Sequence, residues 1–228
     1  MSQKDVFLNG EGDAWYNRTI KAEKGKPEQG DIWSLLKRSF SFLDMSDSEQ
    51  SVLEIGCSDG RRLAEMQKIL KAKYYGVDPS HKAIEAGKNL YPEISLQVGT
   101  ADTLPFKEDM FNMVIFGFCL YLCDRKHLFK IAYEADRVLK SDGYLCIIDF
   151  YSSIPYNNSY KHYNGISSYK MDYSTLFRWN PAYSLVATIP SSHGGNIFHK
   201  DVDERLALHI LYKNMDAWQP RDPFVEVN

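Results

Sequence analysis

Between residues 50 and 150, short apolar runs alternate with segments of helical periodicity. The apolar runs are SVLEIG, KYYGVD, ISLQVG, FNMVIFGF and GYLCIIDF, at 51–56, 73–78, 94–99, 111–118 and 143–150. The segments at 61–72, 80–91 and 125–140 carry apolar side chains on one helical face. Five short strands alternating with helices predict βαβ units joined by right-handed crossovers. We therefore expect an α/β fold with a mostly parallel, doubly wound sheet.

The flanking segments read differently. Residues 30–43 have nearly helical periodicity, with Asp31 placed to cap the helix start. Residues 151–181 are rich in Tyr, Ser and Asn and show no clear period. Two later runs, at 182–190 and 204–214, read as strands, and the loop between them contains Gly194-Gly195. This pattern predicts a hairpin that closes one edge of the sheet, followed by a tail at 215–228.

The loop after the first strand has two readings. Gly56-Cys57-Ser58-Asp59-Gly60 fits the G-x-S-x-G nucleophile elbow of α/β-hydrolases. An acid and a histidine are available later in the chain, among Asp149, His193, His199 and His209. An elbow on the first strand, however, has no earlier strand and loop to supply the oxyanion donor. We therefore disfavour a hydrolase.

The other reading is a glycine-rich cofactor loop. It requires an acid at the end of the second strand, about 20 residues on, to bind ribose hydroxyls. Asp78 stands there. Glu54 lies two residues before Gly56, where its negative charge would repel a dinucleotide pyrophosphate, and Arg61 or Arg62 replaces the third dinucleotide glycine. The loop therefore disfavours a nicotinamide cofactor.

Several separated motifs now match one family. VLEIGCSDG, YYGVDPS, GTADTLPF, FNMVIFGFCLYL and EADRVLKSDGYLCIIDF occur in an order and spacing that resemble the class I S-adenosylmethionine-dependent methyltransferases. The resemblance covers about residues 50–150 well and the closing hairpin weakly. It implies a seven-stranded sheet in the order 3-2-1-4-5-7-6, with the last strand antiparallel. The chain departs from the family pattern at Ser58, where glycine is usual.

The resemblance also implies a set of cofactor-binding residues. Gly56, Cys57 and Gly60 would line the amino-acid end of S-adenosylmethionine, Asp78 would accept from both ribose hydroxyls, and Ala101 with Asp102 would hold the adenine amino group. In the N-terminal arm, Trp15 and Tyr16 would cover the methionine portion and Arg18 would pair with its carboxylate. The neighbouring positions expected to contribute are Ser58, Pro79, Thr103, Phe116, Gly117 and Phe118.

The acceptor is expected to bind beside the insert at 151–181, where this family commonly builds its acceptor pocket. Side chains there that suit stacking and anchoring are Tyr151, Tyr163, Tyr169 and Lys170. A general base is needed if the acceptor is a hydroxyl of high pKa. The favoured candidates are His162 and Tyr121, and Asp149, Tyr151 and His193 are also available.

The whole chain is expected to be one domain, 1–228. Its parts would be an N-terminal arm and helix (1–49), a cofactor-binding core (50–150), an acceptor lid (151–181), a closing hairpin (182–214) and a tail (215–228). The resemblance implies methyl transfer to a small molecule, plausibly a sugar derivative or surface-glycan precursor. Two alternatives stay open: an S-adenosylmethionine-binding protein without catalysis, and a nicotinamide-dependent oxidoreductase.

Composition indicates which classes of partner to expect. The 27 Lys and Arg against 30 Asp and Glu give a net charge of −3, which offers no electrostatic reason to expect nucleic acid. No apolar run is long enough for a membrane span, and the N-terminus lacks the apolar core of a signal peptide, so we expect a cytoplasmic protein. The four cysteines lie in or beside apolar runs, which predicts free thiols and no metal site.

Overall fold

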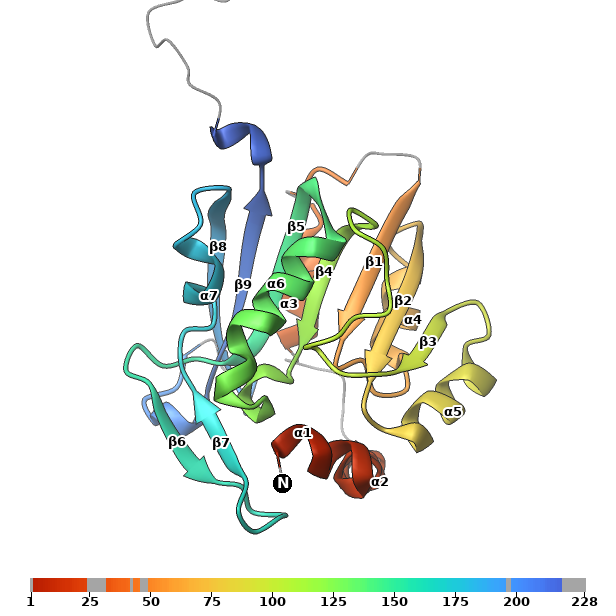
Figure 1. Ribbon diagram of the computed structural model, residues 1–228, viewed down its shortest axis with the longest axis vertical. Helices are drawn as coiled ribbons and strands as arrows, with labels where there is room; N and C mark the ends of the chain where they lie inside the picture. Colours follow the sequence, from red (N-terminus) through yellow and green to blue (C-terminus); the bar gives the residue numbers. More distant parts are fainter. Residues whose placement is uncertain (1, 24–31, 42, 46–48, 196–197, 219–228) are drawn as a thin grey trace, which may run out of the picture.

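The computed structural model describes residues 2–23, 32–41, 43–45, 49–195 and 198–218. Its centre is a seven-stranded sheet in the order β3-β2-β1-β4-β5-β9-β8 (Figure 1). The strands are β1 Gln50–Ile55, β2 Ala72–Asp78, β3 Ser95–Val98, β4 Phe111–Gly117, β5 Leu139–Phe150, β8 Tyr183–Ser192 and β9 Arg205–Lys213. β1 to β5 are parallel, and β9 pairs antiparallel with both β5 and β8. With β8 and β9 counted as the sixth and seventh strands, the predicted order is confirmed.

Helices cover both faces of this sheet. α3 Ile32–Ser39, α4 Arg61–Gln67 and α5 His81–Leu90 pack on one face, and α6 Leu128–Val138 and α7 Thr175–Arg178 on the other. β4 contributes side chains to the hydrophobic core on each face. Met113 and Ile115 pack in the core under α3, α4 and α5, and Val114 and Phe116 pack in the core under α6 and α7. All four side chains are fully buried, as a central parallel strand requires. The Asp31 cap predicted for α3 lies outside the described residues.

The N-terminal arm is helical. It forms α1 Gln3–Val6, a π-helical turn Phe7–Glu11 and α2 Gly12–Glu23. The turn contains Gly10 at φ 134°, a conformation that favours glycine. Asp13 fastens α2 to the start of α5: its Oδ1 accepts from Ser80 Oγ at 2.7 Å and from the Lys82 backbone N–H at 3.0 Å. The arm consequently lies across the carboxyl ends of β1, β2 and β4 (Figure 1).

The tyrosine-rich insert contains regular structure that its sequence did not reveal. It forms a two-stranded antiparallel ribbon, β6 Tyr156–Ser159 and β7 Ser167–Lys170, before α7. The ribbon contacts the N-terminal arm: Ser167 N–H donates to Gln3 Oε1 at 3.0 Å, and Tyr160 Oη donates to Glu11 Oε1 at 2.9 Å. Two segments far apart in sequence therefore lie side by side at one end of the sheet (Figure 1).

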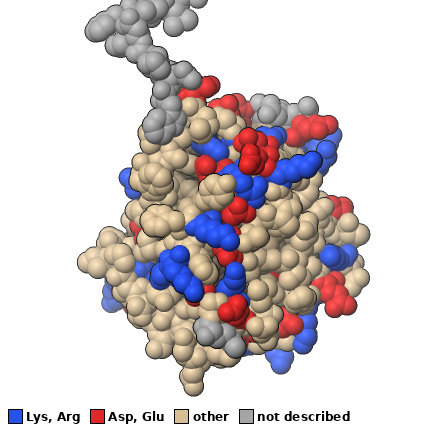
Figure 2. Space-filling view, viewed as in Figure 1, with Lys and Arg blue, Asp and Glu red and all other residues tan. Residues whose placement is uncertain are grey.

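Basic and acidic side chains are interspersed over the face drawn in Figure 2, so neither sign dominates its described part. The four cysteines are free thiols, as predicted. None of the helices within the described ranges is long and apolar enough to cross a membrane.

Candidate functional site

A pocket lies between the N-terminal arm and the carboxyl ends of the central strands, the place where open α/β sheets bind ligands. Its walls come from the arm, from the ends of β1, β2 and β4, and from the loops that follow β3 and β4. The lining residues are Lys4, Phe7, Gly12, Trp15, Ile55, Gly56, Val77, Asp78, Pro79, Gly99, Thr100, Ala101, Asp102, Gly117, Phe118, Cys119, Tyr121, Leu122, Cys123, Asp124, His127 and Ile131. We call this the strand-end pocket.

Asp78 is fixed at the end of β2 by two backbone donors. Its Oδ2 accepts from the Ser58 N–H and its Oδ1 from the Ser80 N–H, both at 2.9 Å. Burial raises the pKa of Asp78, while those two N–H donors oppose the rise. Each carboxylate oxygen keeps a second lone pair, so the group can still accept hydrogen bonds from a ligand.

The glycine loop brings its backbone close to this carboxylate. Gly56 has φ 80°, and a Cβ there would lie 2.7 Å from Cys119 Cβ, so a larger residue would not fit. Ser58 adopts φ 53° and contributes its backbone N–H to Asp78. Gly60, at φ 76°, precedes α4. The loop therefore positions backbone groups, and the Ser58 hydroxyl needs no nucleophilic role.

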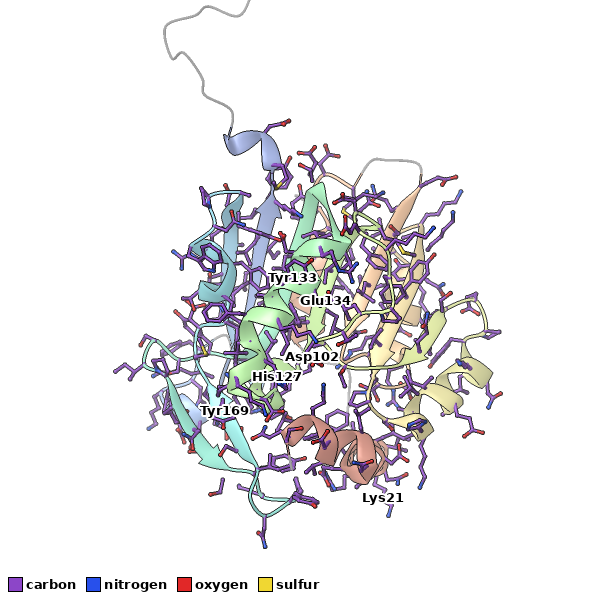
Figure 3. The ribbon with its side chains drawn as sticks, viewed as in Figure 1. Lys21, Asp102, His127, Tyr133, Glu134 and Tyr169 are labelled. Carbon is purple, nitrogen blue, oxygen red and sulfur yellow. The ribbon has the colours of Figure 1, made fainter. Side chains whose placement is uncertain are left out.

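Asp102 forms the opposite end of the strand-end pocket. Its Oδ1 accepts from Thr100 Oγ1 at 2.8 Å, and its Oδ2 from Lys4 Nζ at 2.8 Å. His127 Nδ1 lies 3.9 Å from Oδ2, and Figure 3 shows the two residues beside each other. Burial disfavours the charged form of Asp102, but the hydrogen bonds from Lys4 and Thr100 outweigh it and lower its pKa. Asp102 is therefore a carboxylate at neutral pH.

Beneath the glycine loop lies a buried ion pair. Arg62 Nη2 is 2.7 Å from Glu54 Oε1, and the Glu54 side chain is fully buried. Burial raises the pKa of Glu54 to about 7, and Arg62 opposes that rise. A Cβ at Gly117 would lie 2.3 Å from Glu54 Oε1. The pair accordingly sits directly behind the pocket wall formed by Gly117.

The loop after β4 is held by the carboxylate at the end of β5. Asp149 Oδ2 accepts from the backbone N–H groups of Leu120, at 2.8 Å, and Tyr121, at 3.3 Å. Burial raises the pKa of Asp149 to about 7, against the lowering effect of its backbone donors. Phe118, two residues before Leu120, has φ 61°, which a bulky side chain rarely adopts.

A second pocket lies beyond Phe118, under the β6–β7 ribbon. Its lining residues are Phe150, Asn158, Ser159, Tyr160, Lys161, His162, Ser168, Lys170, His193, Asp203 and Glu204. We call this the ribbon pocket. The ring centroids of Phe118, which lines the first pocket, and Phe150, which lines the second, are 5.1 Å apart. One layer of aromatic rings therefore separates the two pockets.

Many of the cofactor residues expected from the sequence meet in the strand-end pocket: Trp15, Gly56, Asp78, Pro79, Ala101, Asp102, Gly117 and Phe118. Cys57 and Phe116 instead face the core, and Thr103 donates to the Asp102 carbonyl. Ser58 and Gly60 act through the backbone, as described above.

The structure places two of the residues expected to bind the cofactor, both on α2, outside the lining of the strand-end pocket. The side chain of Tyr16 is buried, and its hydroxyl lies 3.4 Å from Asp59 Oδ2. Arg18 has other partners than a bound ligand, because its guanidinium pairs with Glu11 and donates to Tyr160 Oη at 3.2 Å. Neither residue lines the pocket. Both side chains serve instead to attach α2 to its neighbours.

The residues expected to bind the acceptor do not meet in one pocket. Lys170 and His162 line the ribbon pocket, and Tyr121 lines the strand-end pocket. Tyr151, Tyr163 and Tyr169 line neither, and the Tyr169 ring instead stacks under the Arg125 guanidinium, 4.2 Å from its centroid. Lys170 Nζ donates to Asp203 Oδ1 at 2.8 Å.

Sequence reasoning missed Lys4, Phe7 and His127 in the strand-end pocket. Lys4 reaches Asp102 across 98 positions of the chain, and no local pattern marks such a contact. The charged residues Asp124–Lys126 before His127 gave no signal for its orientation either. The sequence could identify Lys4 and Phe7 as pocket residues only if the position of the arm over the strand ends were already known.

Comparison with known proteins identifies this arrangement. Residues 52–143 match the family model described as a methyltransferase domain. Over 103 residues the chain is 31% identical to a demethylmenaquinone methyltransferase of Chlorobaculum parvum, covering 45% of this chain and 42% of that protein. The chain thus spans less than half the length of that relative.

Two solved structures share the fold. A 1,6-didemethyltoxoflavin-N1-methyltransferase of Burkholderia thailandensis, bound to 1,6-didemethyltoxoflavin and S-adenosylhomocysteine, has a TM-score of 0.68 at 13% identity over 92% of this chain and 88% of that one. The [4+2]-cyclase SpnF has a TM-score of 0.68 at 12% identity over 94% and 97%. At such identities the likeness is one of fold. Residues 52–143 are therefore similar to a methyltransferase domain, and the chain shares its fold with a solved S-adenosylhomocysteine-bound methyltransferase.

Proposed function

We propose that the protein transfers the methyl group of S-adenosylmethionine to a small molecule. The observation that carries the proposal is the pair of carboxylates, Asp78 and Asp102, at the two ends of an otherwise largely apolar pocket over the strand ends. Adenosine offers two ribose hydroxyls and an exocyclic amino group as donors, and an apolar ring between them. The pocket supplies acceptors and apolar surface in that order.

Each residue has a physical role in this proposal. Asp78, held by two backbone N–H groups, accepts from the ribose hydroxyls, and Asp102 accepts from the adenine amino group. Charge-assisted hydrogen bonds of this kind contribute about 1.5–3 kcal/mol each. Trp15 and Phe7 close the pocket from the arm and exclude water. When bound, the cofactor supplies an activated methyl group on a sulfonium.

The acceptor is proposed to enter through the ribbon pocket. That pocket adjoins the strand-end pocket through the aromatic layer and is built partly from the insert at 151–181. Methyl-transferring relatives that act on small molecules, such as the demethylmenaquinone enzyme, support a small acceptor. The narrower expectation of a sugar derivative or glycan precursor rests on resemblance, and so does the expectation that His162 or Tyr121 takes the acceptor's proton.

A second candidate function is binding or catalysis without methyl transfer. The observation that favours it is the fold shared with SpnF, which is a [4+2]-cyclase. Two measurements separate these functions. Calorimetry should show S-adenosylmethionine binding and no heat with a nicotinamide dinucleotide. Labelled methyl should then pass from S-adenosylmethionine into a metabolite extract. Binding without transfer would favour the second candidate, and binding of the dinucleotide alone would exclude both.

A further inference from the structure

The wall between the two pockets is an aromatic cluster of Phe118, Tyr121, Phe150 and His193. The Phe150 centroid lies 5.1 Å from those of Phe118 and Tyr121 and 5.2 Å from that of His193, and the His193 and Phe118 centroids are 5.7 Å apart. Phe118 and Tyr121 face the strand-end pocket, whereas Phe150 and His193 face the ribbon pocket. His193 therefore lines the ribbon pocket and packs against Phe118 and Phe150, the rings that stand between this pocket and the proposed cofactor.

His162 occupies a different place. Its ring packs edge-on against Tyr160, with centroids 5.3 Å apart, and Tyr160 is bound in turn to Glu11 of the arm. His127 lines the strand-end pocket but lies 3.9 Å from Asp102, at the end assigned to adenine. Of the imidazoles that line either pocket within the described residues, His193 alone contacts the wall between them.

Asp203 gathers several polar donors at one side of the ribbon pocket. Asp203 Oδ1 accepts from Tyr156 Oη, Asn158 Nδ2 and Lys170 Nζ, each at 2.8 Å. The Lys170 ammonium also lies 4.0 Å from the Phe150 ring centroid. The Asn158 and Lys170 donors are therefore used partly within the protein. The wall of Phe118, Tyr121, Phe150 and His193 presents aromatic rings, which stack best on a flat ligand.

We propose that His193 is the general base for methyl transfer and that the acceptor is a planar ring compound bearing a hydroxyl or N–H group. The proposal rests on the proposed function. In the step it assists, the acceptor oxygen or nitrogen forms a bond to the methyl carbon, and the carbon–sulfur bond breaks with its electron pair on sulfur. The acceptor's proton passes to an imidazole nitrogen of His193. Because reacting atoms must approach to roughly 3–3.5 Å, the proposal requires the Phe118 ring, which stands between the two pockets, to turn aside when substrate binds.

The charges around His193 are compatible with this role. Partial burial among the rings lowers its pKa below the usual 6.5, Glu204 raises it, and the Lys170 ammonium lowers it. Asp203 pairs with that ammonium, and the Tyr121 hydroxyl across Phe150 has a strongly raised pKa and stays neutral. The imidazole is consequently neutral at pH 7, and its free nitrogen can accept a proton.

The test compares His193→Gln with His162→Gln, the same change at the base expected from the sequence, and with the control His81→Gln, the same change at an exposed histidine outside both pockets. Four planar probes, 4-nitrophenol, 8-hydroxyquinoline, 5-hydroxyindole and 2-aminobenzimidazole, are offered with labelled S-adenosylmethionine, and glucose serves as the sugar comparison. We expect the wild type to methylate at least one planar probe, with kcat rising through a pKa below 6.5. His193→Gln should lose that rising limb and about 100-fold in rate, a typical base contribution, while His81→Gln keeps both and His162→Gln keeps the rising limb. NMR titration should assign a pKa below 6.5 to the resonance missing from His193→Gln.

The contrary results are distinct. Methylation of glucose alone, or of no probe, would overturn the planar acceptor. Loss of the limb in His162→Gln instead would return the base to the position expected from sequence, and an unchanged profile in His193→Gln would remove His193. Calorimetry distinguishes failure of the His193 proposal from failure of the proposed function, because the affinity for S-adenosylmethionine should stay within about twofold in all the variants. Absence of cofactor binding to the wild type would contradict the proposed function itself.

Discussion

Buried carboxylates at strand ends decide what this protein can bind. Asp78, Asp102 and Asp149 each follow or end a strand, yet their surroundings differ. Asp102 is kept ionised by Lys4 and Thr100, whereas burial raises the pKa of Asp149 to about 7. Asp149 consequently holds a loop, whereas the ionised Asp102 is the residue for which we propose a ligand-binding role.

Asp78→Asn tests the ribose contact. The amide replaces an ionised acceptor and presents an NH₂ group to donors, so S-adenosylmethionine affinity should fall roughly 10- to 100-fold, or about 1.4–2.7 kcal/mol. Calorimetry measures it. The control is Asp109→Asn, the same change at an exposed loop residue outside the pocket, which should bind normally. Equal affinities for the two variants would remove Asp78 from the site.

Asp149 predicts a pH dependence of stability. Its folded pKa of about 7 lies above the usual 3.8, so between about pH 4 and 7 the folded state holds a proton that the unfolded state has released. This group therefore lowers the free energy of unfolding as pH rises through that window, by at most about 1.4 kcal/mol per pH unit.

Urea unfolding of the wild type and of Asp149→Asn from pH 4.5 to 7 checks this. The wild type's free energy of unfolding should fall relative to that of the variant, which has no proton to lose at this position. Buried Glu54, also near pKa 7, is present in both proteins and cancels in the difference. A difference that does not vary with pH would mean that Asp149 ionises normally.

At the scale of elements, the N-terminal helices complete the site. α1 is docked by Asp124, whose Oδ1 accepts from the Gln3 N–H at 3.1 Å and whose Oδ2 accepts from the Lys4 N–H at 3.0 Å. α2 is fastened to α5 through Asp13 and to the ribbon through Glu11 and Tyr160. The arm thus links the strand-end pocket to the element that covers the ribbon pocket.

Trp15 and Arg18, one turn apart on α2, should respond differently to substitution. Trp15 lines the strand-end pocket, so Trp15→Ala should weaken S-adenosylmethionine binding by at least about tenfold through lost apolar contact. Arg18 pairs with Glu11 and Tyr160, so Arg18→Met should change affinity by less than about threefold. Calorimetry on both variants decides. A larger loss in Arg18→Met would restore the carboxylate-binding role expected from the sequence.

At the scale of the molecule, the sequence predicted the features of the fold that depend on residues close together in the chain. The apolar runs predicted the sheet because strands buried on both faces must be apolar throughout, and the resemblance supplied their order. Asp78 and Asp102 were found because each follows a strand within a motif. The ribbon was missed because its Tyr156–Lys170 and Asn158–Ser168 pairs carry no alternation. Lys4 and the aromatic wall were missed because they depend on contacts between distant segments.

The central claim is that the strand-end pocket binds the adenosyl group with its ribose on Asp78. A crystal structure of the full chain with S-adenosylhomocysteine tests it most directly. We expect both ribose hydroxyls within hydrogen-bonding distance of the Asp78 carboxylate, and the adenine ring beside Ala101 and Asp102. A ligand bound elsewhere, or one in this pocket with its ribose away from Asp78, would contradict the account.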